Sequence, residues 1–142
     1  MTNQTTQREP TIPYPKMHQP HVLIVDDEPL IRNLLTSYLE SRDFIVTTAE
    51  SGAESLRLLE TLGKAVDVVL LDVQMPEMTG PETLKLLHQI RPDLPACFMS
   101  GNFGSYSAQG LLAMPGVKDL FLKPMSLNDL AERLSELAQA NN

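Results

Sequence analysis

Side chains that could do chemistry stand at the ends of four apolar runs in this 142-residue sequence. Two acids follow the first run, a third acid follows VDVVLL, a hydroxyl and a glycine end ACFMSG, and a lysine follows DLFL. These residues are Asp26, Asp27, Asp72, Ser100, Gly101 and Lys123. Carboxylates that lie close together repel one another by up to ~4 kcal/mol per pair at an effective dielectric of roughly 20. Such repulsion requires a compensating cation or a raised pKa, and hard oxygen ligands suit Mg²⁺.

This set of residues is suited to phosphoryl transfer. With a metal neutralising the phosphoryl oxygens, Lys123 would supply a point charge and Ser100 a hydrogen bond. Asp72 could then attack phosphorus and form an acyl phosphate, for which Gly101 leaves space. The pattern therefore predicts a phosphoacceptor aspartate, without a histidine or cysteine nucleophile.

Each of these residues also has an ordinary structural explanation. Asp27 could cap a helix that begins at Pro29, and Asp72 could simply start a loop. Ser100 could belong to a turn, and Lys123 could be a solvated surface lysine. The functional interpretation is favoured because all of them follow strand-like segments and would meet at one edge of a parallel sheet.

Five strand-sized apolar runs alternate with stretches of helical periodicity. The expected strands are 21–25, 44–49, 66–71, 96–100 and 119–122. The expected helices begin at Pro29, cover 51–62, run from Pro81 to Pro92, occupy 105–114 weakly because of Gly110, and follow a Ser126 cap. In the first helix the apolar positions are Leu30, Ile31, Leu34, Leu35, Tyr38 and Leu39, and in the second they are Ala53, Leu56, Leu59 and Leu62. This alternation predicts an α/β fold with a parallel sheet covered on both faces.

Composition limits the remaining possibilities. An apolar content of 42% suits one domain with an ordinary core, and no apolar run is long enough for a membrane span. The net charge of −7 disfavours direct binding to nucleic acid. One cysteine and the lack of a secretory leader favour a cytoplasmic location. Residues 1–20 hold four of the eleven prolines and are predicted to be a flexible tail before a domain at 21–140.

Four motifs resemble those of the receiver domain of two-component response regulators, over roughly residues 21–140. The motifs are VDDEP at 25–29, LLDVQMPEMTG at 70–80, MSG at 99–101 and LKP at 122–124. The resemblance implies a flavodoxin-like, doubly wound sheet of five parallel strands in the order 2-1-3-4-5, flanked by five helices. It also implies Mg²⁺ as the cofactor and a histidine kinase or histidine phosphotransfer protein as the phosphodonor.

The resemblance assigns a role to each site residue. Asp72 is the phosphoacceptor, Ser100 and Lys123 hold the phosphoryl group, and the Lys123–Pro124 peptide is cis. The implied metal ligands are Asp26, Asp27, Asp72 and the backbone carbonyl of Gln74.

Two features depart from the family pattern. The aromatic residue that often stands three positions before the lysine is replaced by Leu120, and Phe121 lies one position further, on the opposite face of the strand. The fourth helix is weak. The usual aromatic switch is therefore not expected in its usual form.

The expected function is that of a signalling phosphoacceptor whose only catalysis is its own phosphorylation and dephosphorylation. Phosphorylation is expected to alter the face made by the fourth helix, fifth strand and fifth helix, which controls a protein partner or forms a homodimer. The run GLLAMPGVKDLFLKP is also similar to receivers of hybrid sensor kinases, which pass phosphate onward. Two alternatives are a pseudo-receiver that only binds proteins and, less in keeping with the DDEP segment, a haloacid-dehalogenase-like phosphatase.

Overall fold

A computed structural model describes residues 19–140 of the chain. Residues 1–18 and 141–142 lie outside the described residues, and with them lies nearly all of the segment predicted as a flexible tail.

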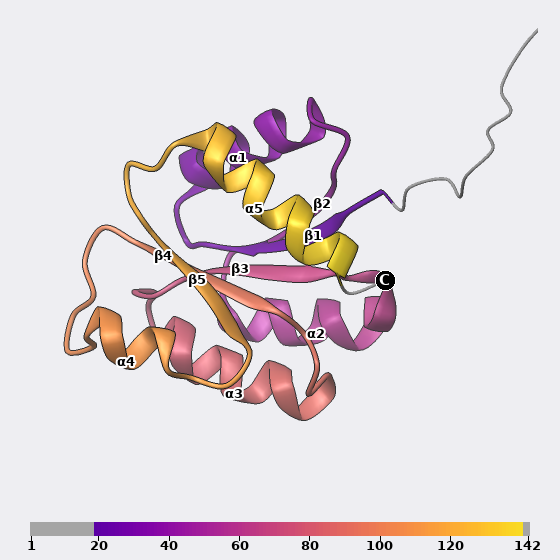
Figure 1. Ribbon diagram of the computed structural model, residues 1–142. Helices are drawn as coiled ribbons and strands as arrows, with labels where there is room; N and C mark the ends of the chain where they lie inside the picture. Colours follow the sequence, from indigo (N-terminus) through magenta and orange to yellow (C-terminus); the bar gives the residue numbers. More distant parts are fainter. Residues whose placement is uncertain (1–18, 141–142) are drawn as a thin grey trace, which may run out of the picture.

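The fold is built on one sheet of five parallel strands in the order β2-β1-β3-β4-β5 (Figure 1). The strands are β1 (His21–Val25), β2 (Ile45–Ala49), β3 (Val68–Asp72), β4 (Ala96–Ser100) and β5 (Val117–Leu122). The three central strands are buried at every residue, as expected for apolar runs covered on both faces. The predicted flavodoxin-like fold and strand order are confirmed.

Five helices cover the two faces of the sheet. They are α1 (Pro29–Glu40), α2 (Gly52–Leu62), α3 (Gly80–Ile90), α4 (Ala108–Leu112) and α5 (Leu127–Ala140), with a short 3₁₀ turn at Gly63–Ala65 after α2. Helices α1 and α5 lie on one face, and α2, α3 and α4 lie on the other (Figure 1). The predicted weak helix is therefore present, but it has only five residues.

Helix starts follow local chemistry. Thr79 and Glu82 form a capping box at α3, in which each side chain accepts a hydrogen bond from the backbone N–H of the other residue. Ser126 accepts a hydrogen bond from the N–H of Asp129 at 3.2 Å, which confirms the predicted cap of α5. These bonds define where two of the loops beyond the strand ends stop.

The buried faces of two helices differ from the prediction. In α2 Ala53 is exposed, and the buried residues are Gly52, Ser55 and Leu59. The reason is close packing on α3, since a Cβ at Gly52 would lie 2.3 Å from the Thr83 Oγ1. In α1, two of the leucines expected on the apolar face are exposed: 82% of Leu30 and 51% of Leu34.

Strand β5 contains one residue more than its partner strand needs. Ala96 pairs with Val117, but Cys97 pairs with Asp119, so Lys118 is left between two consecutive pairs. Regular pairing continues from there to Ser100, which is opposite Leu122.

Candidate functional site

The predicted site residues come together beyond the carboxyl ends of the strands. They line a hollow of about 300 Å³ between the loops that follow β1, β3, β4 and β5. Its lining consists of Asp27, Glu28, Asp72, Gln74, Ser100, Gly101, Asn102 and Lys123. Parallel strands end at the same edge, so side chains distant in sequence share this rim.

Three carboxylates form the acidic part of the site. Asp26, Asp27 and Asp72 each offer an oxygen within 4.8 Å of the other two. Asp26 is fully buried and Asp72 is 5% exposed, while Asp27 is the most open of the three. The alternative in which Asp27 caps α1 is not supported, because Glu28 occupies the cap position and α1 has no side-chain cap.

The ammonium group of Lys123 lies within 4 Å of three carboxylates, those of Asp26, Asp72 and Glu28. Its Nζ lies 2.8 Å from Asp26 Oδ2, 3.5 Å from Asp72 Oδ1 and 3.7 Å from Glu28 Oε1. Burial alone would lower the pKa of Lys123, but the hydrogen bond to Asp26 and the nearby carboxylates raise it above its ordinary value. Lys123 is therefore a charged lysine directed into the site rather than a solvated one.

The carboxyl group of Asp72 is electrostatically strained. Burial, together with repulsion from Asp26 and Asp27, raises its pKa from 3.8 to about 7, although Lys123 and the N–H of Gln74 act in the opposite direction. One lysine thus does not offset the acids around it, and an additional cation at this point would favour the ionised form of Asp72.

The donor atoms fit a magnesium ion. All three side chains present hard carboxylate oxygens, and the open position of Asp27 leaves room for water molecules, which Mg²⁺ retains. Three carboxylates and one lysine share this space, so the side chains leave excess negative charge that a divalent cation can neutralise.

The backbone around Asp72 is fixed by a close contact. The Gly80 N–H donates to the Val73 carbonyl at 2.9 Å, and a Cβ at Gly80 would lie 2.4 Å from the Asp72 carbonyl oxygen. The turn after β3 is therefore held directly against the residue whose side chain occupies the centre of the site.

The hydroxyl of Ser100 is engaged within its own loop. Its Oγ donates to the Asn102 carbonyl at 2.6 Å and accepts from the Asn102 N–H at 2.9 Å. Gly101 leaves space beside it, since the nearest atom to a Cβ there would be the Lys123 Cβ at 3.9 Å.

Two residues near the site were not singled out from the sequence: Asn102 binds Ser100, and Arg32 donates from Nη1 to the carbonyl of Asp26 at 2.8 Å. Glu28, which directly follows the acidic pair and was expected at this rim, has its side chain near Lys123. Nothing in the spacing indicates that Arg32 turns back onto the end of β1.

Comparison with known proteins agrees with this arrangement. The family model described as "Response regulator receiver domain" matches residues 22–135. The chain belongs to this family. Receiver domains are signalling modules rather than classical enzymes.

Similar proteins include a sensor kinase and solved receiver domains. "Sensor kinase CckA" of Brucella abortus is 41% identical over 119 residues, which are 83% of this chain but only 12% of that kinase. A receiver domain protein from Clostridium thermocellum has 27% identity and a TM-score of 0.77, covering 85% of this chain and 95% of its own. A chain of the CheX–CheY–BeF3–Mg complex from Borrelia burgdorferi has 25% identity and a TM-score of 0.75, covering 83% and 88%.

The switch positions of this receiver domain lie as the sequence indicates. Leu120 packs toward the core under α2, α3 and α4, and Phe121 packs toward the core under α1 and α5. The Lys123–Pro124 peptide is cis, as the resemblance implies. The ring of Phe121 therefore lies on the opposite face of the sheet from Leu120, and the strand register does not bring it to the position of Leu120.

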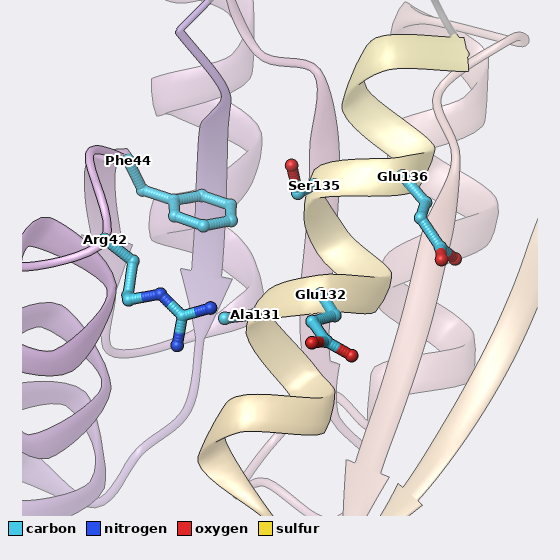
Figure 2. A pocket seen from close by; sticks show the side chains of 6 residues that line it. All are labelled: Arg42, Phe44, Ala131, Glu132, Ser135 and Glu136. Carbon is cyan, nitrogen blue, oxygen red and sulfur yellow. The ribbon is translucent and has the colours of Figure 1, made fainter.

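A second hollow of about 300 Å³ lies away from these residues. It separates Arg42 and Phe44, which follow α1, from Ala131, Glu132, Ser135 and Glu136 of α5 (Figure 2). Arg42 is already bound there to the hydroxyl of Tyr38 and to Asn128 Oδ1. This hollow of the receiver domain contains none of the predicted site residues.

None of the helices within residues 19–140 combines the length and apolar character that a membrane span requires.

Proposed function

We propose that this chain is a phosphoacceptor in a two-component phosphorelay, with residues 21–140 as the receiver domain. Asp72 accepts a phosphoryl group from a histidine kinase or a histidine phosphotransfer protein. The observation that carries the proposal is the position of the Asp72 carboxylate, which is buried at the centre of the rim and 3.5 Å from Lys123 Nζ.

The chemical step is a displacement at phosphorus. A carboxylate oxygen of Asp72 forms a bond to phosphorus, the P–N bond of the donor phosphohistidine breaks, and the imidazole leaves with the electron pair and takes up a proton. Lys123 holds a phosphoryl oxygen by charge, and the Ser100 hydroxyl donates a hydrogen bond to another. Gly101 leaves the space that the incoming group needs.

Asp26, Asp27, Asp72 and the carbonyl of Gln74 are the proposed ligands of Mg²⁺. When bound, the ion supplies positive charge that neutralises the phosphoryl oxygens and the clustered acids. The complex of the CheY-containing neighbour names Mg²⁺ and beryllofluoride, which supports Mg²⁺ as the ion proposed here.

The signal is proposed to leave through protein contacts. Phosphorylation gives Asp72 a group that approaches two negative charges and draws on Ser100, which changes the face formed by α4, β5 and α5. This face controls a protein partner, forms a homodimer or allows phosphate to pass onward, and it takes no part in direct nucleic-acid binding. The chain does this in the cytoplasm, where its phosphodonors act, and it acts as a catalyst only on its own aspartate.

The deciding experiment measures phosphate on Asp72. We expect the wild-type chain to incorporate labelled phosphate from a small phosphodonor or a phosphorylated histidine kinase, only with Mg²⁺ present. Asp72→Asn should incorporate none, and Asp93→Asn should behave as wild type because its side chain is 77% exposed in a different part of the fold. Incorporation by Asp72→Asn would contradict the assignment. Failure of the wild-type chain to bind Mg²⁺ with beryllofluoride would favour a pseudo-receiver, and repeated release of phosphate from phosphomonoesters would favour a phosphatase.

A further inference from the structure

An aromatic ring from outside β5 packs against the same core cluster as Leu120. Tyr106 lies in the loop 101–107, between β4 and α4, and packs against the same core cluster as Leu120. Its hydroxyl is 3.0 Å from the Thr79 Oγ1. This tyrosine directly precedes Ser107, the N-cap of α4.

The partner of Tyr106 is a fixed point close to the phosphoacceptor. Thr79 caps α3, and its neighbour Gly80 is held against the carbonyl of Asp72. The hydrogen bond between Thr79 and Tyr106 therefore connects the rigid turn after β3 to the loop after β4. A second hydrogen bond joins the same two segments, since Gln74 Nε2 donates to the Phe103 carbonyl at 3.0 Å.

The other end of loop 101–107 contains the hydroxyl that a phosphoryl group requires. Ser100 now donates its only hydroxyl proton to the Asn102 carbonyl. To donate to a phosphoryl oxygen, Ser100 must release that carbonyl. The Asn102 side chain also accepts from the Gly104 N–H, so a change at Asn102 reaches the middle of the loop.

We propose that Tyr106 replaces the missing β5 aromatic as the residue that couples phosphorylation to α4. Its hydrogen bond to Thr79 holds loop 101–107 in the phosphate-free conformation, and the bond breaks when Ser100 turns to the phosphoryl group. The start of α4 then moves, and so does the wall of the hollow of about 400 Å³ between α3 and α4, which Pro81, Tyr106 and Met114 line. This inference rests on the proposed phosphorylation of Asp72.

The first test measures the affinity for beryllofluoride in the presence of Mg²⁺. Tyr106→Phe keeps the ring but removes the bond that favours the phosphate-free loop, so its dissociation constant should fall about fivefold, the effect of one neutral hydrogen bond. Thr79→Ser retains a hydroxyl and should remain near the wild-type value. Tyr38→Phe is the matched control, because the Tyr38 hydroxyl accepts a hydrogen bond from Arg42 on the opposite face of the sheet. An unchanged or weaker affinity of Tyr106→Phe would overturn the proposal.

The second test follows the ring itself. In protein labelled with 3-fluorotyrosine, Mg²⁺ with beryllofluoride should shift the fluorine resonance of Tyr106 and leave that of Tyr38 in place, with both assigned from the phenylalanine variants. Binding without movement of the Tyr106 resonance would overturn this inference alone. Absence of beryllofluoride binding together with no phosphate on Asp72 would overturn the proposed function and this inference with it.

Discussion

Asp72 ends a fully buried strand, and this position explains both its reactivity and its cost to the fold. An ionised carboxylate is poorly solvated there, and two further acids lie within 4.8 Å. In the metal-free protein the pKa of Asp72 is therefore about 7, so a substantial fraction of this carboxyl group is protonated at neutral pH. Positive charge beyond that of Lys123 favours its complete ionisation at neutral pH, which links the readiness of the nucleophile to cation binding.

This pKa predicts how stability depends on pH in the absence of metal. The folded-state pKa of about 7 lies above the ordinary value of 3.8, so the folded protein retains a proton that the unfolded chain has lost. The contribution is fully present below about pH 4 and is lost as the pH rises through about 7, by at most about 4 kcal/mol in total. Urea unfolding between pH 5 and 8 in a chelating buffer should show this decline for the wild type and a flatter profile for Asp72→Asn. Equal slopes for both proteins would contradict the raised pKa.

The sequence alone indicated most of the residues at the rim, because each directly follows an apolar run. Asp26, Asp27, Asp72 and Lys123 were found in this way. Asn102, Arg32 and Tyr106 were not, since their positions depend on how a loop or a first helical turn folds back, and residue spacing carries no record of that. The reactive side chains at the strand ends were thus predictable, whereas the hydrogen bonds that orient them depend on the three-dimensional fold.

At the scale of elements, the turn between β3 and α3 is the most constrained connection. Gly80 begins α3 and has no space for a side chain against the Asp72 carbonyl, whereas Gly101 has no atom closer than 3.9 Å to the position of a Cβ. The two glycines flank the same site from different loops, so they form a natural pair for mutagenesis.

Gly80→Ala should reduce the free energy of unfolding by about 1–3 kcal/mol, because overpacking forces the backbone near Asp72 to move. It should also slow phosphate incorporation. Gly101→Ala should change the free energy of unfolding by less than about 0.5 kcal/mol. Urea denaturation at constant pH measures the free energy of unfolding of both variants. A similar decrease for Gly80→Ala and Gly101→Ala would show that the close contact at Gly80 does not cause the destabilisation.

The opposite end of the sheet depends on Arg91, which follows α3. The buried guanidinium donates from Nη1 to the carbonyls of Gly63 and Val66 and joins the end of α3 to the connection before β3. Arg91→Met should therefore lower the free energy of unfolding by about 2 kcal/mol or more, because the carbonyls of Gly63 and Val66 each lose the guanidinium as a donor. Affinity for Mg²⁺ should remain unchanged, since this end is remote from the rim. Arg57→Met, at an exposed position of α2, is the control and should have little effect on denaturation.

Strand and helix order followed from apolar periodicity, but the face of α2 did not. Leucine spacing favoured a face containing Ala53, whereas the structure buries Gly52 and Ser55 because α3 approaches closely at Thr83. Small residues mark close helix contacts that a count of large apolar residues cannot identify. The exposed Leu30 and Leu34 of α1 illustrate the converse, since an apolar position in a helix need not be buried.

For the whole molecule, the acidic rim couples metal binding to folding. Mg²⁺ at 100 times its dissociation constant should stabilise the folded state by about 2.7 kcal/mol, provided that the unfolded chain does not bind it. Thermal unfolding with and without Mg²⁺ measures this gain, which Asp27→Asn should largely remove and Asp93→Asn should retain. Equal stabilisation of wild type and Asp27→Asn would place the ion elsewhere.

The single surplus residue of β5 has a consequence for how this chain tolerates changes in length. Pairing with β4 fixes the register from Asp119 to Leu122 and so the backbone position from which Lys123 extends. The extra residue, Lys118, lies before this paired stretch, on the side of α4. Removing Lys118 should therefore leave the lysine beside Asp26 and keep the Mg²⁺ affinity within about twofold. Insertions and deletions in the connection after α4 are expected to be neutral for the chemistry, whereas the same changes between Asp119 and Lys123 would displace the lysine from the rim.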